Sequence, residues 1–363
     1  MEKNEILTIY GEDIKAMAIR LAEEADLASL IGNRNKKIGL KPNLVVARPA
    51  SEGATTHPEI ALALIAYLKK NGFNNIVILE GAWIGASTKS AFSVCGYKKL
   101  ADAAGIKLID TKHDKTRVCD CKGIQIEICE SALSLDFMIN LPVMKGHCQT
   151  RITCALKNNK GVIPDDEKRR FHSMGLTKPI AHLNVVARND FILVDGICGD
   201  LDFEEGGNPV YSGRMFAARD PVLCDAWAAS LMGIDLANIP YISLAEQLGV
   251  GSADIGKARV RQLNSGNAAL NSTPAPAGKV RQLAAYIAED NACSSCYASL
   301  IFALSRIGRQ ELGLFTEKIS VGQGFRGKQG KLGVGQCTSG FKAFCPGCPP
   351  SGADVLLFCK KQI

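Results

Sequence analysis

The stretch KIGLKPNLVV at residues 37–46 opens the part of the chain that decides its fold. Its apolar run predicts a strand that stops or bends at Lys41, because the proline that follows cannot donate a hydrogen bond within a central sheet. The run NIVILE at residues 75–80 predicts a second, buried strand. Between them, residues 56–70 have a helical pattern that begins with a capping-box sequence at Thr56. A strand, a helix and a strand in this order indicate a parallel pair.

The same alternation continues on both sides of this segment. Residues 90–104 predict a helix and 106–110 a short strand, while residues 6–10 and 13–30 predict a strand and a helix at the start of the chain. Residues 124–128 alternate in a way that predicts an antiparallel strand at the edge of the sheet. The expected fold class is α/β: a mostly parallel sheet flanked by helices, with a small α+β, cysteine-rich module at the C-terminus.

Composition favours a soluble, cytoplasmic globular protein. The chain has 363 residues, 47% of them hydrophobic and 22% charged, which is enough for about two domains. It has no apolar run of transmembrane length and no signal peptide, and its fourteen cysteines indicate a reducing compartment. The net charge of +7 is mild, and no basic run is interleaved with aromatic residues. Neither nucleic acid nor a membrane is therefore an expected partner.

A run of small and polar residues marks the predicted domain boundary. Residues 266–278, GNAALNSTPAPAG, have the composition of a linker. The prediction is an α/β domain over residues 1–265 and a C-terminal iron–sulfur module over residues 279–363. A helix predicted at residues 279–290 would lead into the first cysteine of that module.

The cysteine-bearing tail has the strongest signal of function. Cys293 and Cys296 form one C-x-x-C, Cys345 and Cys348 form another, and Cys337 lies between them. Such a set suits a tetrahedral zinc or an iron–sulfur cube, since both take four sulfur ligands. Spacing alone does not decide between the two. Disulfides are not expected, because disulfide frameworks belong to small secreted domains.

Polar side chains recur just after apolar strands. In an open α/β sheet, ligands bind at the carboxyl ends of the strands, so lysines gathered there would bind an anionic small molecule. Imidazole titrates near neutral pH, which suits proton transfer, although His57 is expected only to start a helix. Any single lysine of this kind is more often simply solvated. The predicted substrate-binding residues are Lys41, Asn43, Lys157 and Asn158, and the predicted catalytic residues are His147, His172, Lys145 and Asp195.

Six short motifs are distinctive as a group. They are LKPN at 40–43, LPVMKGH at 141–147, ALKNNKG at 155–161, FH at 171–172, VDGI at 194–197 and ARDPVLCDA at 218–226. Together they resemble the family called domain of unknown function 362. The tail, with CSSCYASL, VGQC and GCPP, resembles the iron–sulfur-associated tail of some members. The resemblance extends from about residue 35 to residue 358.

This resemblance implies an α/β fold and a 4Fe–4S cluster, which members often hold in an added ferredoxin domain. The chain lacks the C-x-x-C-x-x-C-x-x-x-C-P run of such a domain, so the sparser tail would have to supply the ligands. The resemblance implies that these are Cys293, Cys296, Cys337 and Cys348. Cys345 is an alternative ligand, and zinc is the alternative metal.

Four functions follow from these features, and the last of them is a zinc-stabilised module. The first is a redox protein that passes single electrons between its cluster and an anionic small molecule, which would make it an oxidoreductase with a redox partner protein. The second is a non-redox lyase or isomerase whose cluster is structural or a Lewis acid. The third is an electron-carrier module without a reaction of its own.

Overall fold

The computed structural model describes residues 1–147, 149–200, 204, 206, 209–265, 282–350 and 352–363. These residues fall into two compact units. The C-terminal unit contains the described residues from 282 to 363 together with His147, Gln149 and Glu204, and the large unit contains the others. The linker predicted at residues 266–278 lies outside the described residues, so the domain boundaries remain a prediction.

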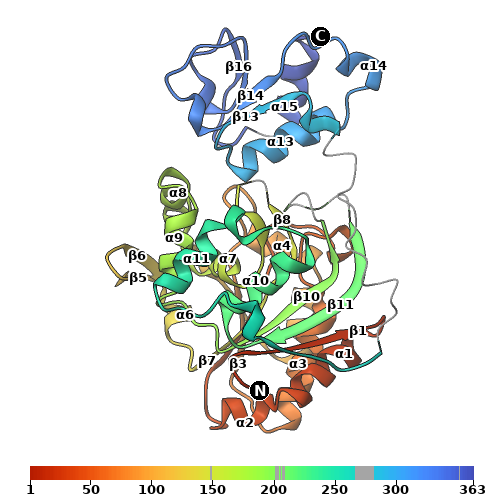
Figure 1. Ribbon diagram of the computed structural model, residues 1–363, viewed down its shortest axis with the longest axis vertical. Coiled ribbons are helices and arrows are strands. Elements are labelled where there is room, and N and C mark those ends of the chain that lie inside the picture. Colours follow the sequence, from red (N-terminus) through yellow and green to blue (C-terminus); the bar gives the residue numbers. More distant parts are fainter. Residues whose placement is uncertain (148, 201–203, 205, 207–208, 266–281, 351) are drawn as a thin grey trace. The chain divides into compact units, whose positions relative to one another are not determined.

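The large unit is built on an eight-stranded sheet in which β11 runs antiparallel to its two neighbours and all other pairs are parallel. This confirms the predicted α/β class with a mostly parallel sheet (Figure 1). In spatial order the strands are β12 (Arg259–Gln262), β1 (Glu5–Tyr10), β11 (Val210–Ala218), β10 (Phe191–Gly199), β7 (Phe137–Leu141), β2 (Ile38–Pro42), β3 (Ile76–Glu80) and β4 (Lys107–Asp110).

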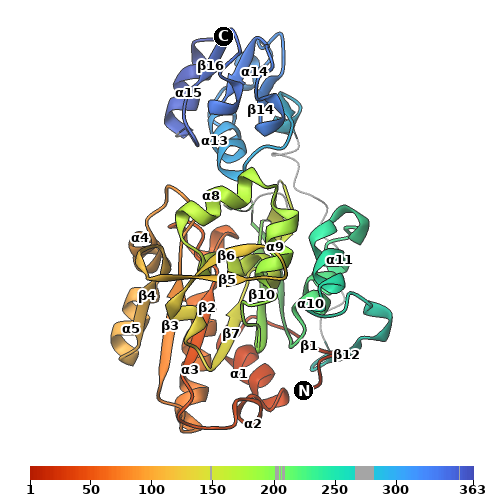
Figure 2. The same cartoon turned by 90° about the vertical axis from the view of Figure 1, so that its left-hand side faces the viewer.

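Helices cover both faces of this sheet (Figures 1 and 2). The reason is visible in β3, where Ile76 and Ile78 face one apolar core while Val77 and Leu79 face another. The helices are α1 (Ile14–Glu24), α2 (Leu27–Ile31), α3 (Pro58–Lys70), α4 (Thr88–Val94), α5 (Tyr97–Ala104), α6 (Glu130–Leu133), α7 (Ala155–Asn158), α8 (Asp165–Ser173), α9 (Thr177–Leu183), α10 (Pro221–Leu231) and α11 (Pro240–Gln247).

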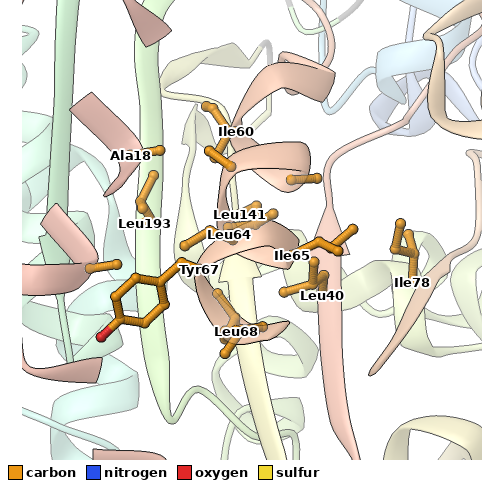
Figure 3. Close-up of a cluster of buried hydrophobic side chains, with 14 of the residues drawn as sticks. Ala18, Leu40, Ile60, Leu64, Ile65, Tyr67, Leu68, Ile78, Leu141 and Leu193 are labelled. Atoms are coloured by element: carbon orange, nitrogen blue, oxygen red, sulfur yellow. The ribbon is translucent and has the colours of Figure 1, made fainter. Parts of the chain in front are cut away.

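Helix α3 shows how the first core is packed. Figure 3 shows Leu64 of α3 beside Leu141 of β7, and Ile65 beside Leu40 of β2. All four side chains are at most 2% exposed. Burying an aliphatic side chain of this size stabilises the fold by about 1.5–3 kcal/mol, so this face of α3 fixes the positions of the strands beneath it.

Several predicted elements differ in detail. The helix predicted over residues 13–30 is split at Asp26, whose φ of 50° is left-handed, and the one over residues 90–104 is split at Gly96, whose φ is 81°. Thr56 does not cap α3, because its hydroxyl donates to the carbonyl of Leu141 instead. Tertiary hydrogen bonds outweigh the local capping signal at this position.

The antiparallel strand predicted near residues 124–128 exists, but it does not join the large sheet. It is β6 (Gln125–Cys129), which pairs with β5 (Thr116–Asp120) in a separate two-stranded sheet. A second small sheet pairs β8 (Lys145–His147) with β9 (Arg151–Thr153). Among the described residues, no helix has the length and apolar character needed to cross a membrane.

The C-terminal unit contains four parallel strands, in the order β13 (Ile287–Glu289), β14 (Ile319–Val321), β15 (Leu332–Val334) and β16 (Ala343–Cys345). The helix predicted at residues 279–290 is wrong for its last part, since residues 287–289 pair with β14, and residues 279–281 lie outside the described part. Strand pairing overrides local propensity here. The helices are α13 (Ser294–Leu304), α14 (Arg309–Leu312) and α15 (Gly352–Lys360), and the 3-10 turns are η7 (Gln323–Phe325) and η8 (Gln336–Thr338).

Candidate functional site

Four loops follow the four strands of the C-terminal unit, and three of them hold the predicted ligands. The loop after β13 leads to Cys293 and Cys296, η8 after β15 contains Cys337, and the loop after β16 contains Cys348. Because the strands are parallel and adjacent, their carboxyl ends meet at one edge of the sheet. Thiols from distant parts of the sequence are therefore gathered at that edge.

Cys296 lies among the other thiols. Its pKa is raised above the ordinary value, first by burial and then by the charges of Cys293, Cys348, Cys337 and Cys345. The backbone of η8 packs closely on it, since a side chain at Gly335 would place its Cβ 3.1 Å from the sulfur. Thiolates this near to one another repel, so they ionise together only when a cation lies between them. The donor set therefore fits a thiolate-bound metal centre.

Nitrogen donors reach two of these sulfurs. Arg326 Nε lies 3.4 Å from Cys337 Sγ, and Gln323 Nε2 lies 3.4 Å from Cys293 Sγ. The hydrogen bond to Cys337 and the charges of the thiols raise the pKa of the Arg326 guanidinium. Both donors come from the loop after β14, so all four loops contribute to the same edge. Hydrogen bonds to sulfur are one of the means by which proteins tune iron–sulfur clusters.

Cys345 has a different environment. It is 3% exposed and belongs to the apolar core of the C-terminal unit, together with the fully buried Cys359. Burial raises the pKa of Cys359 to about 12, with Cys345 as its charged neighbour. Burial and then Asp354 raise the pKa of Cys345 itself. This thiol packs as a small apolar side chain, unlike the four that are intermediate in burial or exposed.

One compact group of potential metal ligands lies in the large unit. Within the described part of the chain, the one group of three potential ligand atoms that all lie within 4.8 Å of one another is Cys154, Cys224 and Asp225. Among the described residues, no three thiols of the C-terminal unit form such a group.

The group formed by Cys154, Cys224 and Asp225 has a structural explanation. The Asp225 carboxylate accepts hydrogen bonds from the backbone N–H groups of Ala155 (2.7 Å) and Leu156 and from the hydroxyl of Tyr241. It thereby caps the start of α7. Burial raises its pKa to about 7 and raises the pKa of both thiols. The sequence motif ARDPVLCDA contains this cap, which the sequence analysis did not identify.

In the large unit, Lys41 forms a buried ion pair. Its ammonium lies 2.8 Å from Glu80, and the side chains of both residues are at most 4% exposed. Burial lowers the pKa of Lys41, although the charge of Glu80 and the hydrogen bond to it act in the opposite direction. The backbone of Gly161 packs against the pair so closely that any side chain there would collide with both groups. The pair is thus enclosed by the protein itself.

Three other predicted residues form a hydrogen-bond chain near this pair. Lys145 Nζ donates to Asn43 Oδ1 (3.1 Å), and Asn43 Nδ2 donates to Asn158 Oδ1 (2.9 Å). Asn158 then donates to the carbonyl of Lys41 and to Asn140. The structure therefore brings Lys41, Asn43, Lys145 and Asn158 together at the carboxyl ends of β2 and β7, where all four are buried.

Asp195 is buried at β10 and holds His57. One carboxylate oxygen accepts the backbone N–H of His57 at 2.8 Å and lies 2.8 Å from its ring Nδ1. Burial lowers the pKa of His57, but the charge of Asp195 and its hydrogen bond, with a contribution from Glu59, raise it by more. His57 was expected only to start a helix, and no pattern in the sequence links it to Asp195.

The two predicted catalytic histidines have other partners. His172 lies 3.4 Å from the Lys160 ammonium, and its pKa is lowered to about 2 by burial and by the charges of Lys160 and Lys157. The ring is therefore neutral near pH 7. His147 Nε2 lies 3.6 Å from Glu204, and both side chains are 2% exposed. The four predicted catalytic side chains thus have four different sets of neighbours.

Comparisons with known proteins add a family and two distant likenesses. The chain is 23% identical over 225 residues to the thylakoid-associated protein sll1697 of Synechocystis, an alignment covering 59% of this chain and 68% of that protein. Its fold has a TM-score of 0.41 and 14% sequence identity to the lactate racemase apoprotein from Thermoanaerobacterium thermosaccharolyticum, over 64% of this chain. The matched part spans 58% of the length of the racemase.

The family match concerns the large unit. It covers residues 38–230 and corresponds to the family described as Domain of unknown function (DUF362). The match ends at residue 230, short of the expected residue 358, so the thiol loops lie outside it. All six distinctive motifs fall wholly inside the matched region. Because the match covers more than half of its 363 residues, the chain belongs to the DUF362 family.

Proposed function

We propose that this protein binds one 4Fe–4S cluster through Cys293, Cys296, Cys337 and Cys348 and acts in electron transfer. One observation carries the proposal: three loops at one edge of a parallel sheet gather these four thiols from distant parts of the sequence. When bound, such a cluster supplies single-electron transfer. Cys345 is left out of the ligand set because it packs in the apolar core.

The surroundings of the thiols support this proposal. Arg326 and Gln323 direct N–H groups at two sulfurs, which favours the thiolate form that a metal requires. Cys348 is exposed, so the site lies near the surface, where an electron can enter or leave. We also propose a reducing, cytoplasmic compartment, which the fourteen cysteines of the sequence favour.

The large unit supports a second proposal, which concerns an anionic small molecule. Lys157, Lys160 and His172 are partly exposed and lie close together, and both lysines act on the imidazole. Two cations beside a neutral ring favour binding of a carboxylate or phosphate. Lys41, Asn43 and Lys145 are buried and bonded to protein groups, so we give them a structural role next to this site.

His172 does not suit the proton-transfer role that was predicted for it. A ring with a pKa of about 2 has no proton to donate near pH 7, and it is a poor base. His57 is the better proton carrier, since its Nδ1 is oriented by Asp195 and its side chain is 14% exposed. An oxidoreductase role would thus require the large unit to contribute binding and proton transfer and the C-terminal unit to contribute the electron.

Single cysteine substitutions test the cluster. Cys337→Ser in the full chain, purified without oxygen, should lose most of its iron, since three thiolates hold a cube poorly. Cys119→Ser, which changes a half-exposed thiol of β5, is the matched control and should keep its iron. Cys345→Ala should keep iron as well. The proposal is wrong if Cys345→Ala loses iron while Cys337→Ser keeps it.

Binding of simple anions tests the second proposal. Calorimetric titration with inorganic phosphate should give a heat of binding that Lys160→Gln removes. Lys36→Gln, which changes a lysine that is not part of this group, should bind phosphate like the unaltered protein. Equal binding by all three proteins would show that phosphate does not use this site. A non-redox lyase or isomerase would be favoured instead if turnover of a bound acid were unchanged after the cluster is reduced.

A further inference from the structure

One stretch of the chain around the thiols carries charge of one sign. Between residues 318 and 352 every charged residue is cationic, and these residues are Lys318, Arg326, Lys328, Lys331 and Lys342. The whole chain, by contrast, balances 43 basic with 36 acidic residues. Such a local excess of one sign produces a positive potential at the surface of the C-terminal unit.

Four of these cations lie on two loop segments that pack side by side. The N–H of Lys342 donates to the carbonyl of Gly330 (2.9 Å), and the next residue donates to the carbonyl of Lys331 (2.9 Å). The rings of Phe325 and Phe341 meet edge to face at 5.7 Å, and Lys328 lies 5.5 Å from the centroid of Phe325. We call this surface, formed by Arg326, Lys328, Lys331 and Lys342, the basic edge.

The basic edge reaches the candidate ligands directly. Arg326 bonds Cys337 through its Nε, so one cation of the edge touches a thiol of the site. Two of the other cations have acidic neighbours, since Lys328 lies 3.4 Å from Asp290 and Lys331 pairs with Glu317. Both pairs are more than one-third exposed, and solvent weakens pairs of this kind. Four cations against two anions leave the edge positive.

We infer that the basic edge docks an acidic electron-carrier protein, an inference that rests on the proposed function. A carrier bound there would approach the cluster from the side of Cys337. One electron then passes from the reduced carrier to the cluster: the carrier is oxidised, the cluster is reduced, and no bond forms or breaks. Opposite charges steer such partners into contact and raise the association rate, and salt screens the effect.

The contact with a thiol favours a redox protein over other anionic partners. A membrane or a nucleic acid also binds cations, but neither gains from lying beside an electron-transfer centre. The edge-to-face contact of the half-buried Phe325 with the buried Phe341 holds the two loop segments of the edge together.

The test uses the full chain and an acidic plant-type [2Fe–2S] ferredoxin as the probe. Calorimetry at low and high salt should give binding that weakens as salt rises. The double variant Lys328→Gln/Lys342→Gln should bind about fivefold more weakly at low salt and depend less on salt. The matched control is Lys360→Gln/Lys361→Gln, which removes the same charge from exposed residues at the end of α15 and should bind like the unaltered protein.

Iron content, measured on each protein, separates this inference from the proposed function. An iron-loaded double variant that binds ferredoxin as tightly as the control would overturn the docking surface and leave the cluster in place. Binding to phosphatidylserine vesicles, with none to ferredoxin, would overturn it in favour of a membrane surface. An unaltered protein without iron would instead contradict the proposed function itself.

Discussion

The two units of this protein both gather polar side chains at the carboxyl ends of parallel strands, but they do so in opposite ways. In the large unit, Lys41 is paired with Glu80 and covered by the backbone of Gly161, so opposite charges are already matched. In the C-terminal unit, Cys296 lies among thiols that would repel it when ionised. A group whose opposite charges the fold already matches needs no ligand, whereas thiols that lie together ionise together only with a cation between them. The difference directs the search for a cofactor to the C-terminal unit.

The largest expected effect concerns the buried ion pair. Lys41→Ala would leave Glu80 buried without its ammonium and should lower the free energy of unfolding by about 3–5 kcal/mol. Lys37→Ala, at a half-buried lysine just before the same strand whose ammonium donates only to Ser134 among the described residues, should change it by less than about 0.5 kcal/mol. Urea denaturation measures both. Equal stability of the two variants would mean that the ion pair is not the structural group described above.

A second effect concerns Asp225, which the large unit also satisfies internally. Its pKa of about 7 in the folded state is above that of an unfolded aspartate, so the native state retains a proton that the unfolded state has lost. The stabilisation that this proton gives the folded state is complete below about pH 4 and is lost as pH rises to 7. Over that range the free energy of unfolding falls by at most about 1.4 kcal/mol per pH unit. Asp225→Asn should remove this slope from the measured free energy of unfolding. Parallel pH profiles for the two proteins would contradict the assignment.

A third effect sharpens the description of the thiol site. Gly335 has a φ of 89° and lies against Cys296, whereas Gly327 has a φ of 74° and open space around it. Alanine at Gly335 should cost about 1–3 kcal/mol of backbone strain, because its ψ of 159° lies in a region that essentially only glycine adopts, and alanine at Gly327 is strained by its positive φ as well. Gly335→Ala should in addition displace the Cys296 sulfur and lower the iron content, while Gly327→Ala should keep its iron. Equal iron content in both variants would show that the close packing has no part in binding.

The smallest effect concerns the tuning of the cluster. Arg326→Leu removes a cationic N–H donor from Cys337. A positive charge at this place stabilises the reduced cluster, which is the more negative form. Its loss should therefore lower the midpoint potential of the cluster. Arg309→Leu, at an exposed arginine of α14, should leave the potential unchanged. A redox titration followed by electron paramagnetic resonance measures both. An equal midpoint potential in the two variants would show that Arg326 does not tune the cluster.

The comparison also explains what the sequence could and could not predict. Strands such as β2 and β3 were predictable because each is a short apolar run followed by a helix. The convergence of Lys41, Asn43 and Lys145 followed from parallel topology. The enclosure of Lys41 did not, since the backbone of Gly161, which is distant in sequence, packs against it. The pairing of His57 with Asp195 has no local signal at all.

In the C-terminal unit, the scaffold was predictable in part. The runs at residues 319–321 and 332–334 indicate two short strands and residues 353–358 a final helix, and β14, β15 and α15 confirm them. Strands β13 and β16 have three residues each, too few for periodicity to identify, and were missed. One signal was present in the sequence: VGQ occurs at residues 321–323 and again at 334–336, and each copy joins a strand to a 3-10 turn. That repetition indicates two equivalent turns of a parallel sheet.

Analysis of iron and acid-labile sulfide in the full chain, purified without oxygen, tests the central claim most directly. The account predicts about four irons and four sulfides per chain and a paramagnetic signal that appears on reduction. A colourless protein that contains one zinc and no iron, and that gives no such signal, would contradict it.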